Sequence, residues 1–247
     1  MTMRCRLFAL TALFAGTAAA ADIVVLSAGA VEPGLHPAIA AFERQTGHRV
    51  QVTFNTTPQI QKRIGAGDTC DVVIAPPAAT KEFLKDGRVE SEGVNLGRVG
   101  VGVVLRAGAP VPDLSTAAAL KGAVLAADSL VINRASTGIY VEGLLRKLGV
   151  WGEVEPKTTR YPDGVGVMEH VLHGKGREFG FGAITEILLY KEKGLRLAGP
   201  LPDEIQNYTA YVASVATGGK NTAAARELVA YLASPESRKA FVSAGIE

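Results

Sequence analysis

Cysteine is nearly absent from this 247-residue sequence, which contains only Cys5 and Cys70. Cys5 lies in a stretch that we interpret as a leader, so Cys70 would be alone in the mature chain and no intrachain disulfide could form. A protein outside the cytoplasm that lacks a disulfide needs a sizeable apolar core. A hydrophobic content of 47% can supply this core. Cys70, just before an apolar stretch, is typical of a buried, unreactive thiol.

Long hydrophobic runs are also missing. A membrane anchor needs about 20 consecutive apolar residues, and no run approaches this length. The N-terminal run from Leu7 to Phe14 is short, is preceded by Arg4 and Arg6, and is followed by small residues from Ala18 to Ala20. This pattern predicts a cleaved secretory signal peptide over residues 1–20. We therefore expect a periplasmic mature protein that does not insert into the membrane after cleavage.

The sequence has no excess of positive charge once the predicted leader is removed. Loss of Arg4 and Arg6 reduces the 26 lysine and arginine residues to 24, which equals the 24 aspartate and glutamate residues. Domains that bind nucleic acid usually carry a clear basic surplus. We therefore expect no nucleic-acid partner.

The common motifs of enzymes and metal sites are absent as well. The sequence contains no Gly-x-Ser-x-Gly nucleophile elbow, no phosphate-binding Gly-x-x-x-x-Gly-Lys-Ser/Thr loop and no His-Glu-x-x-His zinc motif. His170 and His173 are spaced to share one side of a helix next to Glu169, but no third ligand is close. We expect no metal, no cofactor and no enzymatic activity. The alternative is a periplasmic hydrolase or lyase that uses His170, His173 or Asp163.

The sequence does contain a regular alternation of apolar strands and amphipathic helices. The first hundred residues predict strands over 23–26, 49–54 and 72–75, separated by helices over 35–45 and 59–66. Strands that are apolar throughout and alternate with helices are typical of a parallel sheet covered on both faces, so the fold class is α/β. The pattern continues with strands over 99–105, 157–161, 179–184, 195–201 and 208–215, helices over 80–86, 139–148, 165–173, 222–232 and 235–244, a helix end and a strand within 120–127, and a loop over 128–138.

The turn Phe54-Asn55-Thr56-Thr57-Pro58 joins an expected strand to an expected helix. Thr57 is a typical helix cap, and Pro58 is a typical first helical residue. The free N–H groups at a helix start carry partial positive charge, so they suit an anion or another ligand rich in acceptor oxygens. We interpret this turn as one wall of a ligand cleft.

Seven segments spread along nearly the whole mature chain form a recognisable series: Ala21 to Ala30, Phe54 to Pro58, Gly65 to Gly67, Cys70 to Val72, Gly138 to Tyr140, Lys147 to Trp151, and Gly180. In their order and spacing, these segments resemble the periplasmic molybdate-binding proteins of ABC importers. The resemblance implies a two-lobed type II periplasmic binding protein fold, each lobe being a mostly parallel sheet flanked by helices. Lobe 1 would comprise residues 22–102 plus 211–247, and lobe 2 residues 103–210. It also implies a monomer that binds a small-molecule anion and delivers it to an ABC permease in the inner membrane.

The resemblance further implies which residues contact the ligand. One ligand-binding serine of the family aligns with Ala30, which has no hydroxyl, although Ser27 could supply one instead. The other family serine aligns with Thr57. Two backbone N–H groups that contact the ligand in the family align with Thr137 and with a position near Val165. The ligand-binding tyrosine of the family aligns with Ala183, which has no phenol. The full set of predicted ligand-binding residues is Ser27, Ala28, Gly29, Ala30, Asn55, Thr56, Thr57, Ser136, Thr137, Gly138, Val165 and Ala183.

The missing donors leave two ligand classes open, a molybdate- or tungstate-like oxyanion and an organic acid. Each hydrogen bond lost from a buried oxyanion costs about 1 to 3 kcal/mol. Alanine at position 183 also enlarges the site, which favours a bulkier ligand. Arg134 and Arg160 flank the predicted cleft and could bind a carboxylate through paired hydrogen bonds. In either case we expect a solute-binding protein whose two lobes close on an anion.

Overall fold

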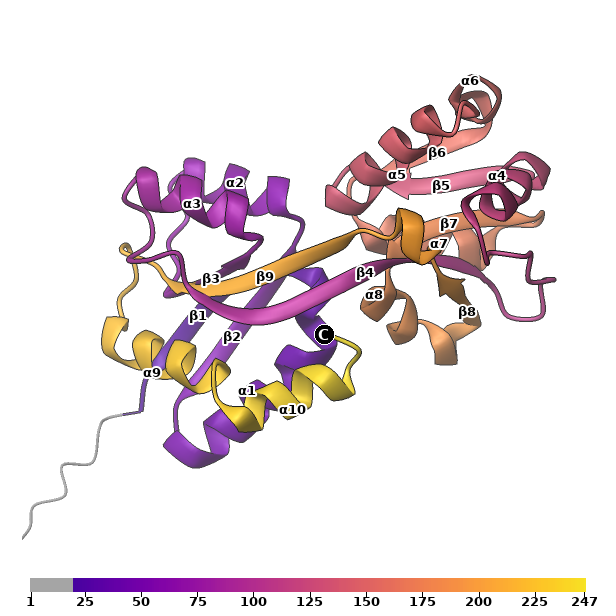
Figure 1. Cartoon of the computed structure of the whole chain (residues 1–247). Coiled ribbons are helices and arrows are strands. Elements are labelled where there is room, and N and C mark those ends of the chain that lie inside the picture. Colours follow the sequence, from indigo (N-terminus) through magenta and orange to yellow (C-terminus); the bar gives the residue numbers. More distant parts are fainter. Residues whose placement is uncertain (1–19) are drawn as a thin grey trace, which may run out of the picture.

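The computed structural model describes residues 20–247, so the predicted signal peptide lies, except for Ala20, outside the described residues. Helices and strands alternate along the chain (Figure 1). In order, the elements are β1 (Asp22–Ala28), η1 (Gly29–Val31), α1 (Glu32–Thr46), β2 (Arg49–Asn55), α2 (Thr57–Gly65), β3 (Val72–Ala75), α3 (Pro77–Lys85), β4 (Val94–Arg106), α4 (Ala117–Ala126), β5 (Ser129–Asn133), α5 (Ser136–Lys147), α6 (Trp151–Val154), η2 (Glu155–Lys157), β6 (Thr158–Tyr161), α7 (Gly164–His173), β7 (Glu178–Ala183), α8 (Ile184–Leu189), η3 (Lys191–Lys193), β8 (Leu195–Pro200), η4 (Asp203–Ile205), β9 (Tyr208–Val215), α9 (Thr222–Leu232) and α10 (Pro235–Ser243). Between residues 20 and 247, no helix has the length and apolar character needed to cross a membrane.

The strands form one mixed sheet in the order β2-β1-β3-β9-β4-β7-β5-β6, with β8 paired to β4. At one end of the sheet, β1 pairs in parallel with both β2 and β3. At the other end, β5 pairs in parallel with both β6 and β7. The predicted parallel strands covered by helices are therefore present in both halves, and the antiparallel strands β4 and β9 join the two halves.

Strands β4 and β9 pass between the two halves of the molecule (Figure 1). The N-terminal part of β4, Val94 to Gly100, pairs with β9. Further along β4, Val101 to Val104 pair with β7, and Gly102 to Arg106 pair with β8. The two long strands therefore form the connection on which any movement of one half against the other depends. The division of the chain at residues 102 and 210 into two lobes stays our proposal.

The apolar core explains why the central strands are hydrophobic on both faces. In β3, Val72 and Ile74 belong to a cluster with residues of α1 and α9, whereas Val73 and Ala75 belong to a cluster with residues of α2 and α3. The second half repeats this arrangement, because Val103 and Val104 of β4 enter two different clusters. Alternate side chains of a strand point to opposite faces, so a strand that is covered on both sides must be apolar throughout.

Three local predictions were wrong. The strand expected within residues 120–127 is absent, because helix α4, capped by Thr116 and rich in alanine, continues to Ala126. Residues 129–133, predicted as part of a loop, form strand β5, and Leu130, Val131 and Ile132 are buried. The predicted cap Thr57 is instead the first residue of α2, while Thr56 caps the helix and its N–H donates to Gln59 Oε1 at 2.7 Å. Pro58 is tolerated one position later because the N–H groups of the first turn lack intrahelical partners.

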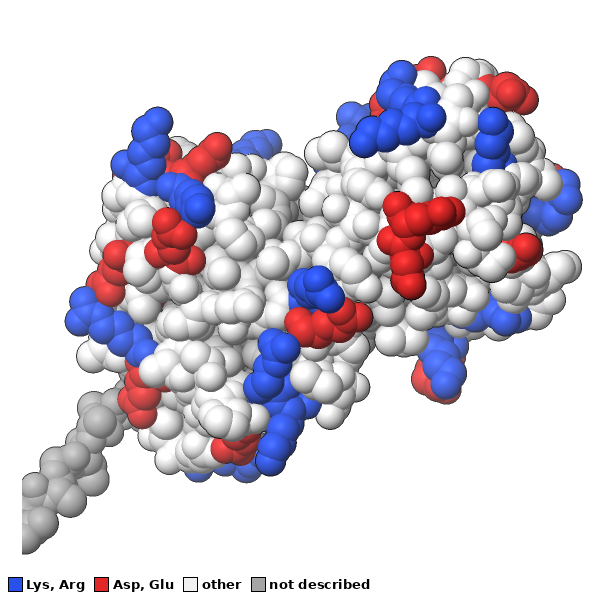
Figure 2. Space-filling view, viewed as in Figure 1, with Lys and Arg blue, Asp and Glu red and all other residues white. Residues whose placement is uncertain are grey.

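Charged side chains are interspersed on the face drawn in Figure 2, where no large area carries a single sign. A surface of this kind produces no strong long-range field in one direction.

Candidate functional site

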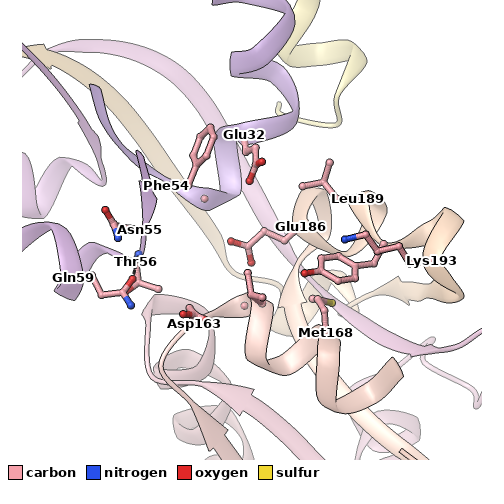
Figure 3. A pocket seen from close by; sticks show the side chains of 14 residues that line it. Glu32, Phe54, Asn55, Thr56, Gln59, Asp163, Met168, Glu186, Leu189 and Lys193 are labelled. Carbon is pink, nitrogen blue, oxygen red and sulfur yellow. Dashed lines mark hydrogen bonds between the residues drawn. The ribbon is translucent and has the colours of Figure 1, made fainter. Parts of the chain in front are cut away.

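Two adjoining cavities lie where the carboxyl ends of β1 and β2 meet the helix starts of the second half. We call them the inner chamber, of about 30 Å³, and the outer chamber, of about 370 Å³. The outer chamber is shown in Figure 3. Both chambers are lined by the same five residues at their junction, namely Gly29, Asn55, Thr56, Gly164 and Glu186. They therefore form one continuous cleft with a narrow polar end and a wider mouth.

The inner chamber is formed largely by the starts of helices. Thr57 begins α2, Ser136 and Thr137 begin α5, and Gly164 begins α7, and all four line this chamber. The first N–H groups of a helix have no intrahelical acceptor, and the helix dipole adds partial positive charge there. The hydroxyls of Thr57 and Thr137 add further donors. This arrangement can hold an anionic group without any lysine or arginine side chain.

Asn133, at the end of β5, fixes the start of α5. Its Oδ1 accepts hydrogen bonds from the backbone N–H groups of Ala135 and Gly138, both at 3.0 Å. Gly138 also packs so closely on the backbone of Asn133 that a side chain would clash. The predicted ligand residue Gly138 is thus placed behind the chamber wall, and its N–H is already used. Sequence reasoning missed Asn133 because its role depends on its place at the end of β5, a strand that was not predicted.

Glu186 lies at the junction of the two chambers and was also missed. It projects from α8 into the middle of the cleft (Figure 3). Within residues 20–247, no hydrogen bond or ion pair engages its carboxylate. Desolvation raises the pKa of Glu186 to about 7, and the nearby carboxylates of Glu32 and Asp163 contribute to the increase. The side chain keeps partial solvent exposure, so this proton is accessible from the cleft.

Tyr211 brings a phenol to the inner chamber, although position 183 lacks one. It lies on β9, is buried, and lines the chamber together with Ala183. Burial, followed by the charge of Glu186, raises the pKa of Tyr211 well above its usual range, an effect partly offset by the hydroxyls of Thr209 and Ser136. Tyr211 is therefore a neutral hydrogen-bond donor at physiological pH.

The outer chamber combines an apolar wall with polar groups at its mouth. Phe54, Met168, Leu189 and Tyr190 supply the apolar surface, and Lys193 lies at the side opposite Gln59 (Figure 3). The Lys193 ammonium lies 4.3 Å from the centre of the Tyr190 ring and is exposed to solvent. A ligand with an anionic head in the inner chamber could thus place a hydrocarbon part and a second anionic group in the outer one.

Most of the predicted ligand-binding residues come together in this cleft. Nine of them line the inner chamber, namely Ala28, Gly29, Ala30, Asn55, Thr56, Thr57, Ser136, Thr137 and Ala183. Val165 lines the outer chamber. Direct contact of these residues with a ligand stays a prediction.

Four predicted residues line neither chamber. They are Ser27, Gly138, Arg134 and Arg160. Ser27 is buried, and its Oγ donates a hydrogen bond to the Ala28 carbonyl at 3.1 Å. Arg134 is exposed. Arg160 pairs with Glu142 at 3.2 Å and lies against the Trp151 ring. The geometry therefore gives no support to these arginines as anion partners.

With this geometry established, comparisons with known proteins place the chain in a family. The sequence model for the family described as Bacterial extracellular solute-binding protein matches residues 23–247. The chain is 28% identical over 233 residues to a protein named Aconitate isomerase from Pseudomonas sp., covering 91% of this chain and 87% of that protein. It is 26% identical over 242 residues to the Molybdate-binding protein ModA of Azotobacter vinelandii, covering 94% of this chain and 92% of that protein.

The fold is also similar to solved structures. The periplasmic molybdate-binding protein of Azotobacter vinelandii superposes with a TM-score of 0.72 at 17% identity, covering 91% of this chain and 98% of that one. The predicted type II periplasmic binding protein fold is confirmed by this likeness, and the predicted resemblance to molybdate-binding proteins is confirmed by the relative from the same organism.

One prediction is contradicted by these comparisons. The chain was expected not to be an enzyme. However, a relative whose match covers 91% of this chain is named as an isomerase. That expectation is withdrawn. The alternative of a hydrolase or lyase built on His170, His173 or Asp163 is not favoured either. Because the family match spans nearly the whole described structure, the chain belongs to the bacterial extracellular solute-binding proteins.

Proposed function

We propose that this protein binds a small organic anion with two or more carboxylate groups in the cleft, as a periplasmic monomer that presents the anion to an ABC permease of the inner membrane. The observation that carries the proposal is the continuity of the two chambers, one small and rich in donors, the other larger and partly apolar. Anion binding agrees with the molybdate-binding relative. The choice of an organic acid follows from the shape of the cleft.

A carboxylate head suits the inner chamber because its oxygens accept hydrogen bonds from helix N–H groups and hydroxyls. Thr57 comes from the first half of the chain and Thr137 from the second, so an anion between them contacts both halves. A ligand that interacts with both sides binds the closed arrangement more tightly than the open one, and it therefore shifts the population toward closure. Closure is the change that a permease can recognise.

A simple tetrahedral oxyanion would leave the outer chamber unused. The apolar wall around Phe54 and Met168 matches the carbon skeleton of an organic acid, and Lys193 is placed to pair with a second carboxylate. Alanine at position 183 leaves room beside Tyr211 for a planar carboxylate. These features support a polycarboxylate over molybdate or tungstate.

A second function, isomerisation of an unsaturated polycarboxylate, is favoured by one specific observation. The cleft holds Glu186, a carboxyl group whose pKa of about 7 allows it to accept and to release a proton near neutral pH. A relative of similar length is named for the isomerisation of aconitate. Capture and isomerisation use the same cleft, so one does not exclude the other.

Thermal unfolding of the ligand-stripped mature protein tests the ligand class. The panel would contain cis- and trans-aconitate, citrate, tricarballylate, molybdate, tungstate and sulfate. A ligand at a thousand times its dissociation constant adds about 4 kcal/mol to the free energy of unfolding, which corresponds to roughly 8 to 16 °C for a protein of this size. We expect this increase with polycarboxylates. An increase with molybdate and tungstate alone would contradict the proposal.

Proton NMR of the same samples tests the second function. If the protein isomerises aconitate, either isomer will convert to the same mixture over time. Stable spectra for both isomers, together with a clear thermal shift, would limit the function to binding.

A further inference from the structure

We propose that Glu186 is the catalytic residue that removes a proton from a carbon atom of a bound unsaturated acid and returns it to another carbon, which moves the double bond. This inference rests on the second function proposed above. It assigns the chemistry to one side chain, whereas the family match and the name of the relative assign none.

The position of Glu186 supports this role first. Its carboxylate lies at the junction of the two chambers, so a ligand with a carboxylate in the inner chamber has its next carbon atoms beside Glu186 (Figure 3). Gly29 and Gly164 flank the carboxylate, and a Cβ atom at Gly29 would lie 2.9 Å from Oε1. Two glycines thus leave room for the carboxylate in the cleft without interposing a side chain of their own.

The surroundings of Glu186 give it the required proton affinity. Glu32 at the start of α1 and Asp163 at the start of α7 face it with negative charge, and Tyr211 faces it from β9. Tyr190 and Lys193 line the outer chamber farther along the same segment. Desolvation and the two carboxylates bring the pKa close to neutrality, where a group can serve as base in one half of a reaction and as acid in the other.

The other titratable groups of the cleft are engaged or unsuitable. Asp163 Oδ1 accepts the N–H of Gly166 at 3.0 Å and so caps α7. Glu32 is engaged by His36, with 3.3 Å between Glu32 Oε1 and His36 Nε2. Tyr211 binds its proton too tightly to act as a base near neutral pH. Glu186 is therefore the group in this cleft that is best placed to receive a proton from a ligand.

The reaction balances without any further reagent. The C–H bond of the CH₂ group next to the double bond breaks, its proton goes to Glu186, and its electron pair spreads through the double bond into the adjacent carboxylate. The proton then returns from Glu186 to the far carbon of the former double bond, where a new C–H bond forms. The double bond has moved by one carbon, and a propene tricarboxylate thereby converts between its geometric isomers. No electron is gained or lost overall.

The inner chamber stabilises the intermediate of this reaction. Negative charge that develops on the carboxylate oxygens faces the N–H groups at the starts of α2 and α5 and the phenol of Tyr211. Fixed donors aimed at a developing oxyanion are among the largest contributions to enzymatic rate. These donors thus lower the barrier to removal of a proton from the CH₂ carbon, because they stabilise the charge that spreads onto the carboxylate oxygens.

Deuterium exchange tests the assignment directly. The mature protein would be incubated in D₂O with trans-aconitate, and loss of the CH₂ proton signal would be followed by NMR. We expect the wild-type protein to exchange these protons, with a rate that rises through a midpoint near pH 7 as Glu186 becomes the free base. Glu186→Gln should reduce the rate by about 100- to 10,000-fold and should still bind trans-aconitate in calorimetry.

Two further variants separate catalysis from folding. Glu186→Asp keeps a carboxylate but retracts it, so we expect a rate between those of the wild type and Glu186→Gln. Glu192→Gln on the exposed surface of η3 removes the same charge outside both chambers and should leave the rate unchanged. Exchange by Glu186→Gln at the wild-type rate would overturn the inference.

The other outcomes are equally distinct. Binding of trans-aconitate by the wild-type protein without any exchange would overturn the inference and leave the proposed binding function intact. Failure of the wild-type protein to bind either aconitate isomer, citrate or tricarballylate would overturn both.

Discussion

Gly29, the first residue of η1, lies so close to Glu186 on α8 that a Cβ atom at position 29 would be 2.9 Å from the Glu186 Oε1 atom. The two residues are far apart in the sequence, but together they form the junction between the inner and outer chambers. The absence of a side chain at position 29 is thus a condition for the position of the carboxylate. This close approach links the backbone at the end of β1 to a carboxyl group whose pKa is raised to about 7.

Replacement of Gly29 by alanine should displace the Glu186 carboxylate. The new methyl group meets the far end of a flexible side chain, so the fold should persist while the carboxylate rotates away from the junction. We expect the deuterium exchange rate of trans-aconitate to fall at least tenfold. Gly143→Ala is the matched control, because Gly143 lies within α5 with no atom near the added methyl group. That variant should gain about 0.5 to 1 kcal/mol in unfolding free energy and keep its exchange rate.

Removal of two hydroxyls should weaken anion binding without affecting the fold. Thr57 and Thr137 both line the inner chamber, on opposite sides of the cleft. We expect the double change Thr57→Ala and Thr137→Ala to reduce the affinity in calorimetry by about 2 to 4 kcal/mol, roughly 30- to 1,000-fold. Thr53→Ala, at an exposed position of β2 outside both chambers, serves as control. An unchanged dissociation constant for the double variant would remove the inner chamber as the anion site.

Glu186→Gln should stabilise the ligand-free protein in alkaline solution. Folding raises the pKa of Glu186 from 4.5 to about 7, so the folded state favours the protonated form. The contribution of protonated Glu186 to the free energy of unfolding is fully present below pH 4.5 and is lost as the pH rises through 7. Each tenfold change in proton affinity is worth about 1.4 kcal/mol. We therefore expect glutamine to add up to about 3 kcal/mol in urea unfolding at pH 8 and under about 1 kcal/mol at pH 5. A gain of equal size at both pH values would contradict the raised pKa.

Lys193→Met should distinguish polycarboxylates from simple oxyanions. Lys193 lies at the outer chamber and is exposed, so its pairing with a carboxylate is worth at most about 1 kcal/mol. We expect a two- to fivefold loss of affinity for tricarboxylates at low salt, a smaller loss at high salt, and no change for a ligand confined to the inner chamber. Lys191→Met, on the same short helix but outside the chamber, is the control. Equal losses in both variants would show that Lys193 acts only through the overall charge.

Much of the fold could be predicted from the sequence because its signals are local. The residues of β3 and β9 form apolar runs bounded by turns, and the structure places both strands at the predicted residues. Strand β5 was missed because its apolar centre is only three residues long and is flanked by Asp128, Ser129 and Asn133. Its strand character depends on pairing with β6 and β7, and neither partner is adjacent in the sequence.

The site could be predicted only in part, for a related reason. Thr57 was found because threonine followed by proline is typical of a helix start, and Thr137 was found only through the resemblance to molybdate-binding proteins. Both line the inner chamber. Glu186 looks like an ordinary glutamate on a short helix, and its raised pKa arises from desolvation in the cleft and from the carboxylates of Glu32 and Asp163 in distant segments. Arg160 shows the opposite error. It lies near cleft residues in the sequence, but strand β6 directs it toward Glu142.

Calorimetric titration of the ligand-stripped mature protein with trans-aconitate, in direct comparison with molybdate, tests the central claim most directly. The two-chambered cleft predicts one site per chain for trans-aconitate and weaker binding of molybdate, which can occupy the inner chamber alone. Tight binding of molybdate with no heat of binding for trans-aconitate would contradict the proposal that the cleft is built for an organic polycarboxylate.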